Sequence, residues 1–231
     1  MRNNKTIFIT GGNRGIGKGL VAQLCYKHNV IFSVRSNQKG QETLDDLSGC
    51  KAKFVVMNVD DPNSVQEGVN KLRTLVNSID ILFNNAGILI SGIQNDNNAL
   101  DTDEESIMKT FNTNTLGVLR VTRHIVPLMG SGGRIINISS GMGQLDDMEG
   151  GHVAYRLSKT ALNALTVILS KELFSNNISV NSICPGWVQT DMGGPSAALT
   201  VEESTMKIVD FSLKDNFPNG KFLRHGELIP W

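Results

Sequence analysis

The sequence lacks any apolar run of the roughly 20 residues that a membrane-spanning helix needs, because its longest apolar runs have the length of β-strands. It also lacks an excess of either charge sign, since 22 basic and 22 acidic residues cancel. A field that attracts nucleic acid or an anionic membrane surface is therefore not expected. The opening MRNNKTIFIT runs straight into a strand-like pattern, which predicts no secretory signal.

Cysteine is scarce as well, with three residues at positions 25, 50 and 184. Their number is odd, their spacing is wide and no C-x-x-C pair occurs. This usage is more typical of reduced thiols in a cytoplasmic protein than of a disulfide scaffold or a zinc site. We therefore expect reduced thiols, a cytoplasmic location and no bound metal.

Linkers, charge blocks and internal repeats are also missing, so residues 1–231 are expected to form a single domain. Short β-branched runs alternate with longer helical patterns. Strands are predicted at 6–10, 30–34, 53–57, 80–84, 134–139, 178–183 and 221–223, and helices near 16–28, 63–78, 103–129 and 153–175. The third helix starts with a capping-box pattern, Thr102-Asp-Glu-Glu105. The alternation predicts an α/β fold with a Rossmann-like, doubly wound parallel sheet of about seven strands.

Such sheets bind ligands beyond the C-terminal ends of their strands, where this chain has polar stretches at 10–17, 35–40, 58–62, 84–98, 140–152 and 185–202. The first contains TGGNRGIGKGL, which misses a P-loop because Gly19 stands where a magnesium-binding hydroxyl is needed. A dinucleotide turn requires less: a tight bend, a close backbone approach and a helix start. Gly11, Gly15 and Gly17 can supply these. A glycine-rich turn without a ligand is the alternative.

With its spacing T-G-x-x-x-G-I-G, the chain resembles the short-chain dehydrogenase/reductase family. Further family motifs follow in the family's order and cover nearly the whole chain: NNAG at 84–87, NTNTLG around Asn114, ISSG with Ser140, YRLSK with Tyr155 and Lys159, and PGWVQTDM at 185–192. Each motif is weak alone, but six in order with the right spacing indicate an oxidoreductase of this family.

The resemblance implies that Asn114, Ser140, Tyr155 and Lys159 form the catalytic set. Tyr155 and Lys159 lie four residues apart on a predicted helix and so share one face. An ammonium ~4 Å from the phenol would lower its pKa by roughly three units, toward the working pH of a general acid. Ser140 would hydrogen-bond the substrate carbonyl oxygen, with Ser139 as its rival. By resemblance, Asn114 would hold a water behind Lys159.

The resemblance also implies a set of cofactor contacts. They are Gly11, Asn13, Arg14, Gly15, Ile16, Gly17, Arg35, Ser36, Asn58, Val59, Asn85, Ala86, Gly87, Tyr155, Lys159, Pro185, Gly186, Val188 and Thr190. NAD enzymes place an acid at the end of the second strand, where this chain has Val34 followed by Arg35. With Arg14 nearby, this pattern favours NADP(H) over NAD(H). Asn58 replaces the family's usual adenine-binding Asp, although its amide oxygen can still accept that bond.

Substrate and partners are less well specified. The substrate pocket is expected between 88–98, 141–152 and 191–203, for a small aldehyde or ketone. The ending HGELIPW resembles a carbonyl reductase subgroup that includes the C-factor signalling protein and Sniffer. By resemblance, the helices at 103–129 and 153–175 would form a homodimer or homotetramer. The alternatives are an NAD(H)-dependent secondary-alcohol dehydrogenase and a non-catalytic NADP(H)-sensing regulatory protein.

Overall fold

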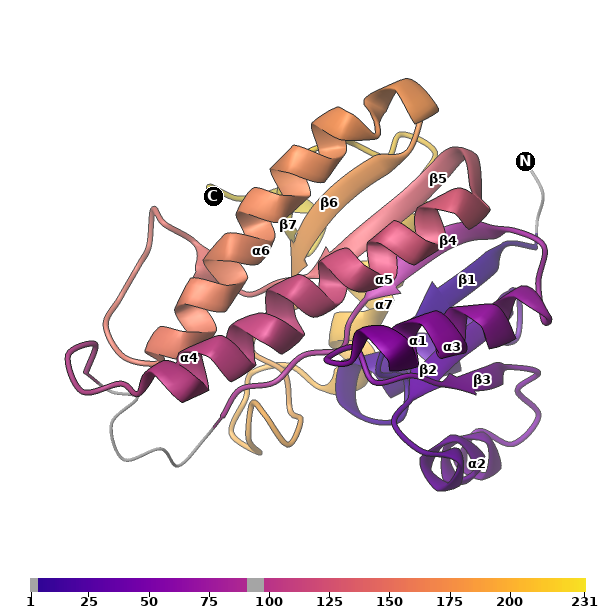
Figure 1. The fold of residues 1–231 in the computed structure, drawn as a ribbon, viewed down its shortest axis with the longest axis horizontal. Coiled ribbons are helices and arrows are strands. Elements are labelled where there is room, and N and C mark those ends of the chain that lie inside the picture. The colour runs from indigo at the N-terminus through magenta and orange to yellow at the C-terminus, as the bar shows by residue number, and fades with distance from the viewer. Residues whose placement is uncertain (1–3, 91–97) are drawn as a thin grey trace.

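A mostly parallel sheet of eight strands lies at the centre of the computed structural model, which describes residues 4–90 and 98–231 (Figure 1). The strand order is β3-β2-β1-β4-β5-β6-β7-β8. Neighbouring strands from β3 to β7 pair in parallel, and β8 returns antiparallel to β7. The strands are β1 (Thr6–Ile9), β2 (Asn29–Val34), β3 (Lys53–Val56), β4 (Ile79–Asn84), β5 (Met129–Ile138), β6 (Ser179–Cys184), β7 (Phe222–Arg224) and β8 (Glu227–Leu228).

Helices cover both faces of this sheet because its central strands are apolar on consecutive positions. They are α1 (Gly15–Leu24), α2 (Asn37–Asp46), α3 (Pro62–Arg73), α4 (Glu104–Phe111), α5 (Gly117–Ile125), α6 (Val153–Glu172) and α7 (Val201–Leu213). One core cluster joins the sheet to α1 and α7, and a second joins it to α3, α5 and α6. The predicted doubly wound α/β fold is confirmed, and the strand order reverses between β1 and β4, where such sheets open a crevice.

Two of the observed helices, α2 and α7, were not predicted. Ser36, in the polar stretch 35–40, caps α2, whose few apolar residues gave no helical periodicity. Two further local predictions are wrong. The predicted helix at 103–129 is interrupted by a π-helical turn, Asn112–Leu116, and ends in a 3-10 turn. Its first cap is Asp103 rather than Thr102, since the Asp103 carboxylate accepts from the Ser106 N–H at 2.7 Å.

The expectation of three reduced thiols is also wrong, because Cys25 and Cys50 form a disulfide. Cys25 follows the last residue of α1, and Cys50 lies shortly before β3. Cys25 belongs to the core cluster that joins α1 and α7 to the sheet, and Cys50 packs against it. Their Cα atoms lie 5.5 Å apart. Cys184 is a buried free thiol. No helix in the described part of the chain is long and apolar enough to span a membrane.

Candidate active site

A cleft of about 540 Å³ opens at the C-terminal ends of the strands, at the predicted edge of the sheet. Its volume is typical of sites for small molecules and cofactors. All of the predicted site residues line this cleft apart from Ser36 and Asn114. Residues 91–97 of the predicted substrate segment at 88–98 lie outside the described residues.

The glycine turn between β1 and α1 has the backbone geometry that an anion requires. Gly11 and Gly15 have positive φ angles of 68° and 50°. A Cβ at Gly17 would lie 2.1 Å from the Gly11 carbonyl oxygen, so any side chain there would close the turn. Arg14 occupies the N-cap position of α1, but its side chain makes no capping hydrogen bond, and the first turn holds no acidic residue. The first N–H groups of α1 are therefore available to a phosphate group.

The loop after β4 fixes this turn through Asn85 and Thr10. The Asn85 side-chain amide donates to the carbonyl oxygens of Thr10 and Gly11, at 2.9 Å and 3.1 Å. The Thr10 hydroxyl accepts in return from the N–H groups of Asn85 and Ala86, at 2.9 Å and 3.0 Å. Sequence reasoning missed Thr10, although it directly precedes the glycine run. These bonds join the two loops on either side of the point where strand order reverses.

Tyr155 and Lys159 come from the first two turns of α6 and lie side by side, almost fully buried. Their exposed fractions are 8% and 5%, and the Lys159 ammonium is 5.6 Å from the centre of the Tyr155 ring. Lys159 donates to the Ile138 carbonyl oxygen at 2.8 Å, which anchors it to the end of β5. The predicted pair therefore does share one face of one helix, directed at the cleft.

Ser140 and Ser139 follow β5 and take different partners. The Ser139 hydroxyl donates to the Asn163 side-chain oxygen at 2.7 Å, and the residue is buried. Ser140 accepts from the Met142 N–H at 3.1 Å and is hydrogen-bonded to Tyr155. Successive residues on an extended chain point to opposite sides, so one serine is structural and the other faces the tyrosine.

The charges of this pair are governed by burial. Burial raises the pKa of Tyr155 to about 12, and its hydrogen bond with Ser140 opposes the rise. Burial lowers the pKa of Lys159 to about 8. The expectation that Lys159 brings the pKa of Tyr155 toward neutrality is wrong, because desolvation of the buried phenolate is the largest influence on that pKa and raises it. Tyr155 therefore keeps its proton at neutral pH.

Asn114 lies in the π-helical turn and is fully buried behind the cleft. Its amide oxygen accepts from the Ile88 N–H at 2.8 Å, and its nitrogen donates to the Ile88 carbonyl at 2.9 Å and the Ser158 hydroxyl at 3.0 Å. A Cβ at Gly87 would lie 3.1 Å from the Asn114 oxygen and 3.6 Å from the Lys159 nitrogen. Asn114 thus joins the loop after β4 to α6, next to Lys159. Its predicted water stays a prediction.

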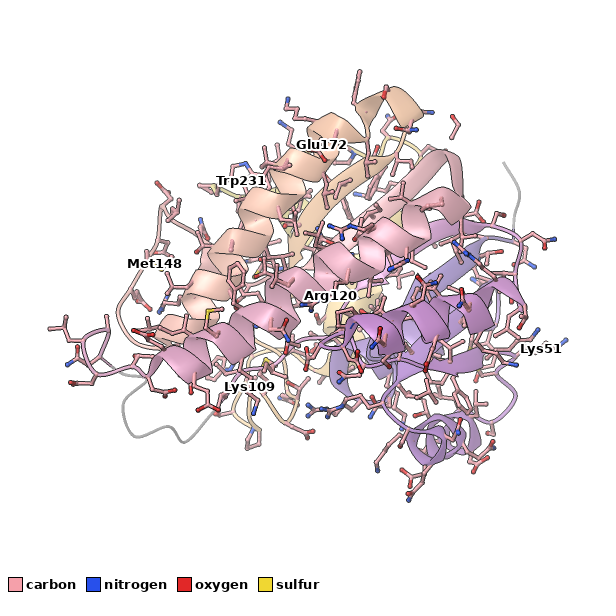
Figure 2. All side chains as sticks on the ribbon, in the orientation of Figure 1. Lys51, Lys109, Arg120, Met148, Glu172 and Trp231 are labelled. Atoms are coloured by element: carbon pink, nitrogen blue, oxygen red, sulfur yellow. A yellow bond between two sulfur atoms is a disulfide. The ribbon has the colours of Figure 1, made fainter. Side chains whose placement is uncertain are left out.

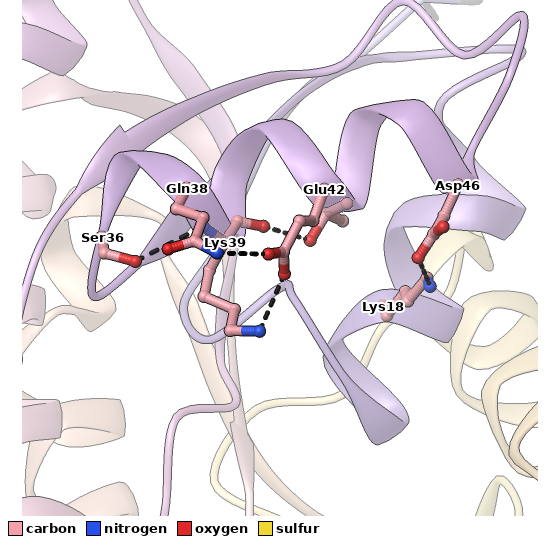
Figure 3. A network of polar contacts seen from close by, with 7 residues as sticks. Lys18, Ser36, Gln38, Lys39, Glu42 and Asp46 are labelled. Atoms are coloured by element: carbon pink, nitrogen blue, oxygen red, sulfur yellow. Dashed lines mark hydrogen bonds and ion pairs between the residues drawn. The ribbon is translucent and has the colours of Figure 1, made fainter.

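At the end of β2, the cations near the cleft differ in their partners. The Ser36 hydroxyl accepts from the Lys39 N–H, and the Lys39 ammonium pairs with Glu42 at 2.7 Å (Figure 3). Lys18 on α1 pairs with Asp46 at the far end of α2 (Figure 3). Arg35 is exposed, lines the cleft and has no ion pair among the described residues.

Arg14 forms an ion pair with Asp191, a cleft residue that sequence reasoning missed. Its guanidinium lies 2.6 Å from the carboxylate of Asp191, and both side chains are more than half exposed. Asp191 follows Thr190, whose hydroxyl accepts from the Gly193 N–H at 3.1 Å and so heads a turn. The two residues are 177 positions apart, and no local pattern signals that they meet.

An apolar rim lies beyond Tyr155. Trp187 is 57% exposed, and its indole N–H donates to the Gly193 carbonyl at 2.8 Å, which fixes the ring on the turn after β6. Trp187, Met142 and Met192 all line the cleft. Met148 lies on the loop that projects past the start of α6 (Figure 2), and its side chain is exposed. This end of the cleft suits an apolar molecule more than a charged one.

Comparison with known proteins agrees with this geometry. A model of the short chain dehydrogenase family matches residues 5–199. Carbonyl reductase Sniffer of D. melanogaster is 30% identical, with a TM-score of 0.88 over 98% of this chain and 99% of its own. The structure of NADPH-bound carbonyl reductase from chicken fatty liver is 28% identical, with a TM-score of 0.88 over 99% and 100% of the two chains. The 3-oxoacyl-[acyl-carrier-protein] reductase FabG of Escherichia coli is 30% identical over 190 residues, which span 81% of this chain and 75% of that protein. The predicted resemblance is confirmed, and the chain belongs to the short-chain dehydrogenase family of oxidoreductases.

Proposed function

We propose that the chain is an NADP(H)-dependent reductase that converts a small aldehyde or ketone into an alcohol. The observation that carries this proposal is that two chemically different groups of residues line the same cleft. Ser140, Tyr155 and Lys159 line one part of it, and the uncapped glycine-rich start of α1 lines another. The first set of residues suits a reacting carbonyl group and the second suits a pyrophosphate. A nicotinamide dinucleotide is the common hydride donor that spans two such sites.

The residues present fit that cofactor. The turn at Gly11, Gly15 and Gly17 leaves a backbone cradle that a side chain would fill. Arg35 and Arg14 would bind the 2′-phosphate that distinguishes NADP(H), because a guanidinium pairs with phosphate in a bidentate manner. The carbonyl reductase of chicken fatty liver, a relative of this chain, was solved with NADPH bound. When bound, NADPH supplies the hydride that reduces the carbonyl carbon.

Tyr155 is the proton donor in this proposal. Burial keeps its phenol neutral, so a proton is held at the cleft until negative charge develops on the carbonyl oxygen. An alkoxide is far more basic than a phenolate, so transfer from Tyr155 to that oxygen is downhill. The Ser140 oxygen already accepts from the Met142 N–H, which leaves its own hydrogen to stabilise the same developing charge.

Lys159 would restore the proton. Its pKa is about 8 and that of Tyr155 is about 12, so the ammonium is the stronger acid of the pair. A Tyr155 phenolate left after proton transfer would therefore take a proton from Lys159. The bond from Lys159 to the Ile138 carbonyl holds the ammonium beside the ring during this step. The apolar rim at Trp187 would receive the substituents of the substrate.

The test is consumption of reduced cofactor by the purified protein. NADPH and NADH are offered separately with a panel of aldehydes, diketones and a 3-oxoacyl thioester, and nicotinamide absorbance is followed. We expect NADPH to be consumed with aldehydes or ketones. Consumption with NADH alone would indicate the NAD(H)-dependent dehydrogenase instead, and binding without consumption across the panel would indicate a sensing protein.

A matched pair of tyrosine variants tests the acid. The chain has two tyrosines, and Tyr26 is exposed at the end of α1, outside the cleft. Tyr155→Phe should lower kcat by about 10²- to 10⁴-fold while the Kd for NADPH stays within about twofold. Tyr26→Phe should behave as the parent protein. Full activity in Tyr155→Phe would refute its assigned role.

A further inference from the structure

Helix α6, which carries Tyr155 and Lys159, begins at two consecutive residues with a left-handed backbone. Gly151 has a φ angle of 72° and His152 a φ angle of 48°. Glycine adopts such an angle readily, whereas a residue with a side chain does so at a cost in free energy. His152 also occupies the N-cap position, where its side chain makes no capping hydrogen bond, although Ser, Thr, Asp and Asn are the usual residues there. His152 is therefore a poor residue for starting this helix.

The location of His152 gives a reason for this choice of residue. His152 lines the cleft together with Ser140 and Tyr155. Asn177 and His225 also have positive φ angles, and neither of them lines the cleft. Violations of local preference that persist in a fold are concentrated at functional sites. The bend at Gly151 and His152 therefore serves the cleft rather than the helix.

One buried arginine holds this bend. Arg156 lies in the first turn of α6 and is 7% exposed. Its Nε donates to the Gly151 carbonyl oxygen at 3.0 Å, and its terminal nitrogens contact the Glu149 carboxylate at 3.1 Å and the Met148 sulfur at 3.9 Å. The three nitrogens of one guanidinium thus contact three residues of one short stretch, which Figure 2 marks with the label at Met148.

The cost of burying this guanidinium indicates a specific role. An arginine is almost never buried unless it is paired. Its charged partner, Glu149, is 80% exposed, so water screens the ion pair and weakens it. The bond to Gly151 is different, because the planar guanidinium fixes the direction of the Nε donor. The backbone N–H of Arg156 also donates to the His152 carbonyl at 2.8 Å. Arg156 therefore holds both left-handed residues.

We propose that Arg156 is a positioning residue for the carbonyl substrate: its bond to Gly151 holds His152 in the left-handed bend, and the His152 imidazole makes a hydrogen bond to the substrate. The inference rests on the proposed reductase function and adds two residues to its site. Ser140 and Tyr155 serve the reacting oxygen, so His152 binds a different part of the molecule. Such a contact is equally strong before and during the reaction, so its loss raises KM and leaves kcat nearly unchanged.

Steady-state kinetics at saturating NADPH test the contact of His152. Benzaldehyde is the first probe, and any member of the panel that the parent protein reduces with a higher kcat/KM replaces it. His152→Gly and His152→Asn both remove the imidazole and suit a left-handed backbone. Each should raise the KM of the probe by about fivefold, the ratio for one lost hydrogen bond, with kcat within about twofold of the parent. Asn177→Gly, at another left-handed position, is the control and should keep the parent KM.

Variants of the arginine test its positioning role. Arg156→Lys keeps a positive charge for Glu149 but lacks the Nε donor to Gly151. It should raise the KM of the probe by about threefold or more, while the Kd for NADPH stays within about twofold. Combined with His152→Gly, it should raise KM no further, because no imidazole is left to misplace. Glu149→Gln removes only the exposed charge and should keep KM within about twofold of the parent.

Magnetic resonance of the histidine rings gives a readout that needs no turnover. The chain has four histidines, so the signal that disappears in His152→Gly from the spectrum of isotope-labelled, ligand-free protein identifies the ring of His152. This signal should shift in Arg156→Lys, and the signals of the other histidines should stay in place.

Several outcomes would overturn the inference. An unchanged KM in both histidine variants would remove His152 from the substrate site. A parent-like KM and ring signal in Arg156→Lys, or additive effects in the double variant, would remove the positioning role. A lower unfolding temperature of Arg156→Lys, with KM, kcat and the Kd for NADPH all altered, would mark Arg156 as a structural residue. In each of these cases, NADPH consumption by the parent protein leaves the proposed function standing. A parent protein that consumes no NADPH across the panel would overturn both proposals.

Discussion

Replacing the buried lysine by methionine should make the ligand-free protein more stable while removing its activity. Lys159 is 5% exposed, and burial lowers its pKa from 10.5 to about 8. At about 1.4 kcal/mol for each pKa unit, the protonated side chain costs about 3 kcal/mol at pH 7. Lys159→Met removes this cost but also the bond to the Ile138 carbonyl, worth about 1 kcal/mol. The expected net gain in the free energy of unfolding is about 2 kcal/mol.

The stability of the parent protein should change with pH in a direction set by the two shifted pKa values. The folded-state pKa of Lys159 is lowered, so between about pH 8 and 10.5 the unfolded chain binds more protons than the folded chain. Stability of the parent protein therefore rises with pH across that window, as the cost of the buried charge disappears. The pKa of Tyr155 is raised, so its contribution is complete below pH 10 and is lost as pH rises toward about 12. Measurements should stop near pH 10, so that the change in the free energy of unfolding reports on Lys159 rather than on Tyr155.

Urea unfolding of ligand-free protein at pH 7 and pH 10 is the assay. Lys159→Met should exceed the parent at pH 7 and lose this advantage by pH 10. Lys171→Met, on the exposed face of the same helix, is the control and should follow the parent at both values. If Lys159→Met is less stable than the parent at pH 7, or if the difference between them does not change with pH, the argument from burial is refuted.

Three further predictions concern the cofactor, the disulfide and the assembly. Arg35→Asp should lower the ratio of kcat/KM for NADPH over NADH by about tenfold or more, because a carboxylate replaces the phosphate-binding cation, and an unchanged ratio would remove Arg35 from the site. Reduction of the Cys25–Cys50 disulfide, which spans 25 residues, should lower the free energy of unfolding by about 3 kcal/mol in urea titrations with and without a phosphine reductant. The free energy of unfolding of Cys50→Ser should equal that of the reduced parent and should not change with reductant. If the reductant does not change the stability of the parent, the disulfide contributes nothing. Light scattering should give a dimer or tetramer, and Ile168→Glu, at an exposed apolar position of α6, should shift it toward monomer; a monomeric parent would contradict this.

Much of the architecture follows from local sequence patterns. β-Branched runs covered on both faces gave strands within one or two residues of those observed, apart from β5, which begins five residues earlier than predicted. Four helical patterns were visible in the same way, whereas α2 and α7 were not predicted. The residues of α2 are almost all polar, so no apolar stripe marked it. The π-helical turn around Asn114 was also not predicted. Asn114 bonds there to Ile88 and Ser158, which lie far away in the chain.

The amino-acid sequence by itself determined the alternation of strands and helices, the glycine turn and the order of the family motifs, because each depends on residues near one another in the chain. Tertiary structure decided the properties that depend on burial or on distant partners. It raised the pKa of Tyr155 where a pairwise argument had lowered it, since desolvation is set by the surrounding fold. It also brought Arg14 to Asp191, a residue 177 positions away in the chain. No local pattern contains these contacts, because they arise only when separate loops meet at the edge of the sheet.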